Sequence, residues 1–233
     1  MEILRANSYA QFRERLTALD IGVPEKLRDR KNEHVELYCA AHLLATLPES
    51  RFAFPLSLYH LDRPDFRLDL GGDVVGIEHT EAVPENVAHA QSMRDDGAGS
   101  DTFFEPYAEP GEAKRSAKKL LEEIDADEAG DGWVGDGSQM WVDVILQVVR
   151  KKLSKASGFT RYQSNWLLIY DNWPNPGVRV EKAAPHLAPL LRSAGAFNTF
   201  DRIFVIRGDR LVEYTENSTE VHDIVSPAQS FDG

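Results

Sequence analysis

This sequence has a single cysteine, no long apolar run and fewer basic than acidic residues. The single cysteine, Cys39, excludes an internal disulfide, and its apolar surroundings, VELYCAAHLLATL, predict a buried position in a helix. No segment approaches the roughly 20 apolar residues that a membrane-spanning helix needs. The first residues, MEILRANSYAQFRERL, lack the apolar core and cleavage site of a signal peptide. We therefore expect a cytoplasmic protein without a membrane segment.

Basic residues are outnumbered, because 26 Lys and Arg stand against 38 Asp and Glu, which gives a net charge of −12. Such a chain is not expected to bind nucleic acid through a generally positive surface, since lysine and arginine supply most non-specific affinity for phosphates. About three quarters of the net charge falls on residues 84–137, which contain few branched apolar residues. We predict a single domain over residues 1–233, with residues 84–137 as an acidic insertion or lid within it.

Apolar periodicity predicts an α/β fold. Apolar residues recur at helical spacing in three segments: residues 31–47, 140–156 and 185–194. Six shorter segments have the composition or alternation of strands: residues 54–60, 64–70, 74–83, 165–171, 201–207 and 210–216. The last of these is predicted to lie at the edge of the sheet. This order indicates a mixed central β-sheet flanked by helices.

A hairpin is the strongest local signal. Gly71-Gly72 lies between two alternating segments, and glycine can adopt positive φ at both positions of a two-residue turn. That turn places Phe66 opposite Ile77 and Asp65 directly opposite Glu78, with the two carboxylates on one face. Directly opposite Cβ atoms lie roughly 4.5 to 5.5 Å apart.

Two ionised carboxylates that close repel each other, so they require a shared proton, a cationic side chain or a metal ion. Alternatively, Asp65 ends its strand at the solvent and Glu78 is an ordinary charge at a strand edge. Glu78 interrupts an apolar run, however, where an unpaired charge would be costly. The sequence therefore favours a functional pair.

A family resemblance rests on these residues. Pro64-Asp65-Phe66, followed thirteen residues after Asp65 by Glu78-His79-Thr80, resembles the motif of the PD-(D/E)XK nuclease superfamily. The preceding helix carries Glu33 and Glu36, and the order αβββαβ is similar to that restriction-endonuclease-like core. The resemblance covers residues 31–207 outside the acidic insertion.

The resemblance implies a metal-dependent hydrolase of phosphodiester bonds. Mg²⁺ or Mn²⁺ would be bound by Asp65, Glu78 and the backbone carbonyl of His79. A glutamate of the first helix often completes such a site, and here Glu36 is the first choice and Glu33 the second. The side chain of His79 should point away from Glu78 by strand alternation.

The sequence departs from the family pattern at the lysine, because Thr80 occupies its place. Some relatives carry the basic residue on the following helix, and Lys152, on one stripe with Ile145 and Val149, is the candidate substitute. The other interpretation is an ordinary lysine whose stem lies along the helix surface. Its neighbours Lys151 and Lys155 either contact a phosphate backbone or form a solvated helix face.

Two functions remain open at this point. One is a divalent-metal-dependent nuclease or related phosphodiesterase, in which the acidic insertion acts as a lid or as a mimic of the substrate. The other is a degenerate, non-catalytic relative that serves as a protein-interaction or regulatory module. The partners are accordingly nucleic acid or protein. Four aromatic residues near the strands are predicted to belong to the core or its rim and give no indication of base stacking: Tyr59, Trp166, Tyr170 and Trp173.

Overall fold

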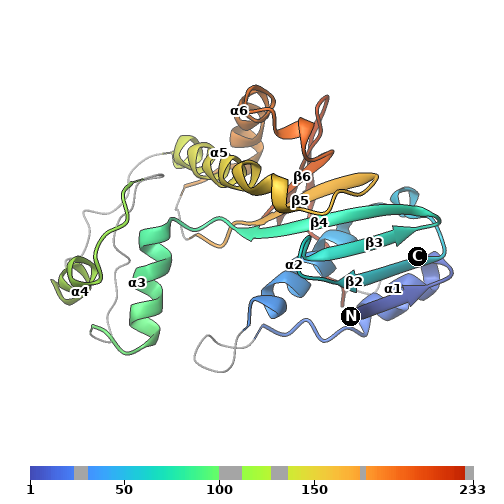
Figure 1. Ribbon diagram of the computed structural model, residues 1–233, viewed down its shortest axis with the longest axis horizontal. Helices are drawn as coiled ribbons and strands as arrows, with labels where there is room; N and C mark the ends of the chain where they lie inside the picture. The colour runs from blue at the N-terminus through green and yellow to red at the C-terminus, as the bar shows by residue number, and fades with distance from the viewer. Residues whose placement is uncertain (24–30, 100–111, 127–135, 174–176, 229–233) are drawn as a thin grey trace.

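The computed structural model describes residues 1–23, 31–99, 112–126, 136–173 and 177–228. In these ranges the protein has one eight-stranded mixed β-sheet and six α-helices (Figure 1). The strands are β1 (Glu2–Ala6), β2 (Leu56–His60), β3 (Phe66–Leu70), β4 (Asp73–Glu81), β5 (Ser164–Tyr170), β6 (Arg202–Arg207), β7 (Arg210–Tyr214) and β8 (Thr219–Asp223). The helices are α1 (Tyr9–Thr17), α2 (Asn32–Thr46), α3 (Glu85–Asp95), α4 (Ala117–Ala126), α5 (Ser138–Lys155) and α6 (Val180–Ser193).

The strands lie in the sheet in the order in which they occur in the chain. The central strands β4, β5 and β6 are parallel, and all other neighbouring pairs are antiparallel. Parallel neighbours need crossover connections, which α5 and α6 provide. The predicted α/β class with a mixed sheet is therefore confirmed.

The helices cover the two faces of the sheet unequally. On one face α1 and α2 pack against apolar residues from β1 to β7, and Cys39 is buried there as predicted. On the other face α5 and α6 pack against β5, β6 and β7. Within the described ranges no helix packs on that second face over β1, β2 and β3, and this part of the sheet faces the viewer in Figure 1.

The hairpin has the predicted register. Phe66 is paired with Ile77 and Leu70 with Asp73, so Gly71-Gly72 forms the two-residue turn. The φ angles of Gly71 and Gly72 are 60° and 116°, which side chains with a Cβ rarely adopt. The alternation of the two strands thus correctly predicted which residues face the same side.

The sheet edges were predicted less well. The expectation that residues 210–216 form an edge strand is wrong, because β8 pairs with the whole of β7. Neither β1 with α1 nor β8 is predicted from the sequence. Both edge strands are five residues long, and neither shows the regular alternation of apolar and polar residues that identifies a strand.

Residues 84–137 follow β4 directly and contain α3 and α4, which project from the sheet in Figure 1. The two helices pack together through a small apolar cluster of Ala90, Leu120 and Ile124. Residues 100–111 and 127–135 of the predicted lid lie outside the described ranges. Among the described helices, none combines the length and the hydropathy that crossing a membrane would require.

Candidate functional site

The candidate site lies at the end of the β3–β4 pairing, where β4 extends beyond the first residue of β3. Ile77 is the last residue of β4 in the ladder with β3, so the next backbone groups on that edge belong to His79. The residue that would face His79 is Pro64, which has no N–H to donate. Two side chains therefore form the hydrogen bonds to the His79 backbone that a strand partner would otherwise form. Asp65 Oδ2 accepts a hydrogen bond of 2.6 Å from the His79 N–H, and Lys152 Nζ donates one of 2.7 Å to the His79 carbonyl.

Lys152 reaches this point from α5. Ile145 and Val149 on the same stripe are fully buried, and Lys152 follows them toward the end of the helix. Its ammonium donates a second hydrogen bond, 2.6 Å long, to Glu78 Oε1, and the side chain is only 19% exposed. The Lys152 ammonium therefore lies against Glu78 and the His79 carbonyl instead of extending into solvent.

Glu78 is itself buried, with 8% of its surface exposed. Its second oxygen, Oε2, is inaccessible and has no hydrogen-bond partner among the described residues. A buried carboxylate oxygen without a donor is unusual, because burial removes water without replacing its hydrogen bonds. This oxygen is the clearest indication that a further group belongs at the site.

Asp65 and Glu78 interact electrostatically, as the register predicts. Burial raises the pKa of Asp65 to about 7; the His79 N–H opposes this shift, the negative charges of Glu78 and Glu36 add to it, and Lys152 weakly opposes it. A carboxyl group with this pKa holds a proton in part of the molecules at neutral pH. A cation bound near Asp65, in addition to the Lys152 ammonium, would favour the ionised form of the Asp65 carboxyl group.

His79 contributes through its backbone, while its side chain lies on the opposite face of β4. Burial lowers the pKa of the imidazole to about 3, and the charge of Lys152 acts in the same direction. The ring is therefore neutral at physiological pH, and its buried Nε2 has no partner in the described ranges. Strand alternation predicted that this side chain points away from Glu78, and the ring is buried there.

The carboxylates open into a cleft of about 1190 Å³. One wall carries Asp65, Glu78 and Thr80, and α5 supplies a basic wall with Arg150, Lys151, Lys152 and Lys155. Thr80, which stands at the motif lysine position, thus faces the cleft. Lys151 forms an ion pair with Glu85 at the start of α3, and Lys155 is exposed at the end of α5.

The two helix glutamates are placed differently. Glu36 Oε2 lies 2.9 Å from His60 Nε2 at the end of β2 and is close enough to Asp65 to raise its pKa. Glu33 is exposed in the first turn of α2. Asp65, Glu78 and Glu36 do not form a group whose ligand atoms all lie within 4.8 Å of one another.

The residues present fit a hard divalent cation. Carboxylate and carbonyl oxygens are the ligands that Mg²⁺ prefers, and the arrangement offers Asp65, Glu78 and the His79 carbonyl. The partnerless Glu78 Oε2 is a donor atom that such an ion would satisfy. Lys152 already bonds to the other Glu78 oxygen and to the His79 carbonyl, so it would share these two groups with the ion.

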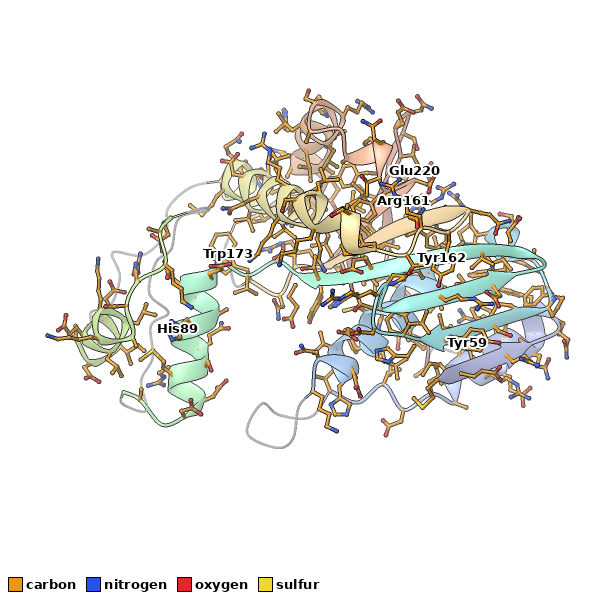
Figure 2. All side chains as sticks on the ribbon, viewed as in Figure 1. Tyr59, His89, Arg161, Tyr162, Trp173 and Glu220 are labelled. Atoms are coloured by element: carbon orange, nitrogen blue, oxygen red, sulfur yellow. The ribbon has the colours of Figure 1, made fainter. Side chains whose placement is uncertain are left out.

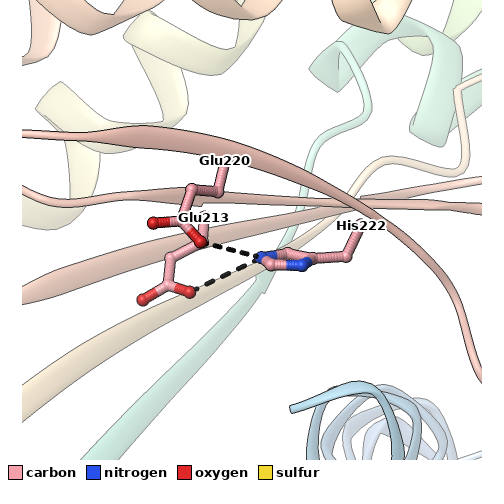
Figure 3. Close-up of side chains that lie close together, drawn as sticks. All are labelled: Glu213, Glu220 and His222. Atoms are coloured by element: carbon pink, nitrogen blue, oxygen red, sulfur yellow. Dashed lines mark ion pairs between the residues drawn. The ribbon is translucent and has the colours of Figure 1, made fainter. Parts of the chain in front are cut away.

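A second group of potential ligands lies far along the sheet, on β7 and β8. Glu213, Glu220 and His222 bring their ligand atoms within 4.8 Å of one another, and His222 Nε2 lies 3.7 and 3.8 Å from the two carboxylates (Figure 3). Glu213, however, is buried and ion-paired with both Arg51 and Arg202. Two guanidinium groups already neutralise the Glu213 carboxylate, so the group is better explained as an ion-pair network around a buried glutamate than as a metal site.

Comparisons of the chain with protein-family models, with curated proteins and with solved structures found no match.

Proposed function

We propose that this protein is a divalent-metal-dependent nuclease or related phosphodiesterase of the PD-(D/E)XK type, with a restriction-endonuclease-like core. The observation that carries the proposal is the position of the Lys152 ammonium on Glu78 and on the His79 carbonyl. A lysine from the following helix thereby supplies the charge that Thr80 cannot supply from β4. Carboxylates and lysine meet in one cleft, as hydrolysis of a phosphodiester requires.

The chain's own residues would divide the work as follows. Asp65, Glu78 and the His79 carbonyl would hold the cation, with Glu36 as an additional candidate. Bound Mg²⁺ or Mn²⁺ would supply a Lewis acid that lowers the pKa of a bound water and offsets charge on the phosphate. Lys152 would orient the attacking water or stabilise the extra negative charge of the transition state.

The neighbouring cations would position the substrate. Arg150, Lys151 and Lys155 line the same cleft and are suited to contact the phosphates next to the scissile bond. In this structure Lys151 is paired with Glu85, the first residue of α3. The acidic insertion would therefore act as a lid whose carboxylate must leave Lys151 before a phosphate can bind there.

Metal binding can be tested by thermal unfolding. Mg²⁺ or Mn²⁺ should raise the melting temperature of the wild-type protein, and the increment should grow with metal concentration because the ion binds only the folded state. Asp65→Ala and Glu78→Ala should abolish this response. Glu220→Ala, at the distant ion-pair network, should retain it. A metal response that survives both site substitutions would contradict the proposed ligands.

The alternative function also has a specific observation in its favour. Lys152 satisfies Glu78 Oε1 and the His79 carbonyl without any metal, so an internal ion pair could have replaced the ion in a non-catalytic protein-interaction or regulatory module. That protein would show no metal-dependent stabilisation. It would also bind its partner equally well in the presence of a chelator.

A further inference from the structure

The open face of the sheet carries a row of aromatic and guanidinium groups beside the site. Tyr59 of β2 is paired with Arg67 of β3, and Arg67 is paired with Gly76 of β4. The ring of Tyr162 lies directly on Gly76, because a Cβ at that glycine would come within 2.7 Å of the ring. One cross-strand row therefore presents Tyr59, Arg67 and Tyr162 on the face that no described helix covers. Figure 2 labels the two tyrosines of this row.

The members of this row contact one another and are held in place. The guanidinium of Arg67 lies 5.3 Å from the centre of the Tyr59 ring, and its charge also interacts with Tyr162. Tyr162 is fixed before β5 by two hydrogen bonds of 3.1 Å between its backbone and the side chain of Asn165. Both tyrosine residues are half-buried and so are partly exposed on this face.

The row is continuous with the candidate site. Asp65 precedes Arg67 by two residues and Glu78 follows Gly76 by two residues, on the same face, which corresponds to roughly 7 Å along the sheet. A chain whose phosphate lies at Lys152 can therefore extend across β4, β3 and β2. A hollow of about 530 Å³ borders this path at Tyr59 and Arg67.

The local charges favour a single strand over a duplex. Arg67 makes two 2.7 Å hydrogen bonds to Asp69, and Arg5 beside Tyr59 is paired with Glu2. With these charges balanced, the surface lacks the excess of cations that binding to duplex phosphates demands. Accessible aromatic rings with a guanidinium between them instead suit unpaired bases, whose flat faces stack on such groups.

We propose that the row formed by Tyr59, Arg67 and Tyr162 binds single-stranded nucleic acid, with a base stacked on each tyrosine and the strand leading into the cleft at Lys152. The direction of the strand rests on the proposed function, whereas the binding itself does not require cleavage.

Binding can be measured by fluorescence anisotropy with labelled single-stranded DNA and RNA oligonucleotides in the presence of a chelator. Tyr59→Leu and Tyr162→Leu should each weaken binding about 10-fold, and the double variant about 100-fold, because leucine removes the stacking ring. Tyr59→Phe and Tyr162→Phe retain the ring and should bind within about 2-fold of the wild type. Tyr9→Leu, a half-buried tyrosine on α1 under the opposite face, is the matched control and should change nothing.

The proposal is overturned if the double leucine variant binds as tightly as the wild type, or if a duplex of equal length binds as tightly as the single strand. Photocrosslinking of the unaltered protein with bromouracil oligonucleotides avoids any effect of substitution on folding. Crosslinks at Tyr59 or Tyr162 are expected, and crosslinks confined to other parts of the protein would contradict the proposal. Tyrosine-dependent binding without metal-dependent cleavage would uphold this surface and reject the nuclease function, so the two failures are distinguishable.

Discussion

Lys152→Met is expected to destabilise the metal-free protein by about 3 kcal/mol at neutral pH, because it leaves Glu78 as a buried charge without its cation. Glu78 is 8% exposed, and the lysine is its hydrogen-bond partner at Oε1. The substitution also leaves the His79 carbonyl without the donor that replaces the missing N–H of Pro64. Chemical denaturation with a chelator present gives the free energy of unfolding directly.

Two further variants separate this effect from a general loss at the end of α5. Lys151→Met removes the next lysine, whose ion pair with Glu85 is exposed, and should cost less than about 1 kcal/mol. Adding Glu78→Gln to Lys152→Met should recover much of the loss, since the uncompensated charge is then gone. Equal losses for Lys151→Met and Lys152→Met would contradict the buried pairing.

Replacing Asp65 and replacing His79 should make the stability of the protein depend on pH in opposite directions. In the chelated wild-type protein, Asp65 and His79 have pKa values shifted to about 7 and about 3. Asp65 binds more protons folded than unfolded between about pH 4 and 7, so it makes stability fall as pH rises. His79 binds fewer protons folded than unfolded between about pH 3 and 6.5, so it makes stability rise with pH.

These opposite contributions overlap and largely cancel from about pH 4 to 6.5. Asp65→Asn should expose the His79 contribution, so that stability rises with pH by on the order of 1 kcal/mol per unit. His79→Gln should expose the Asp65 contribution, with a smaller slope of the opposite sign because Asp65 is only partly buried. Denaturation at a series of pH values measures both slopes, and slopes of the same sign in the two variants would contradict the assigned shifts.

Much of the site's framework could be predicted because it depends on strand alternation. The Gly71-Gly72 turn fixes the register, and the register determines which side chains of β3 and β4 share a face. Helical periodicity likewise placed Lys152 on the stripe with Ile145 and Val149, facing the sheet. These are local rules, and they needed no knowledge of distant contacts.

What could not be predicted depends on contacts between distant segments. The placement of Glu36 is determined by His60, which follows it by 24 residues and lies on another element. Tyr162 lies on Gly76 only because β5 runs beside β4, and nothing in the sequence around either residue indicates that contact. The edge strands were missed because they are short and lack a regular apolar alternation.

Cleavage of labelled oligonucleotides under single-turnover conditions tests the central proposal most directly. The wild-type protein with Mg²⁺ or Mn²⁺ should cleave DNA or RNA, and a chelator should abolish the reaction. Lys152→Ala should reduce the rate by about 100-fold or more while metal still raises its melting temperature, because the proposed role of the lysine is in the transition state. Lys151→Ala should retain most of the rate at saturating substrate. If the wild-type protein is stabilised by metal yet cleaves no single-stranded or duplex DNA or RNA, or if Lys152→Ala cleaves at the wild-type rate, the proposed catalytic role of this site is wrong.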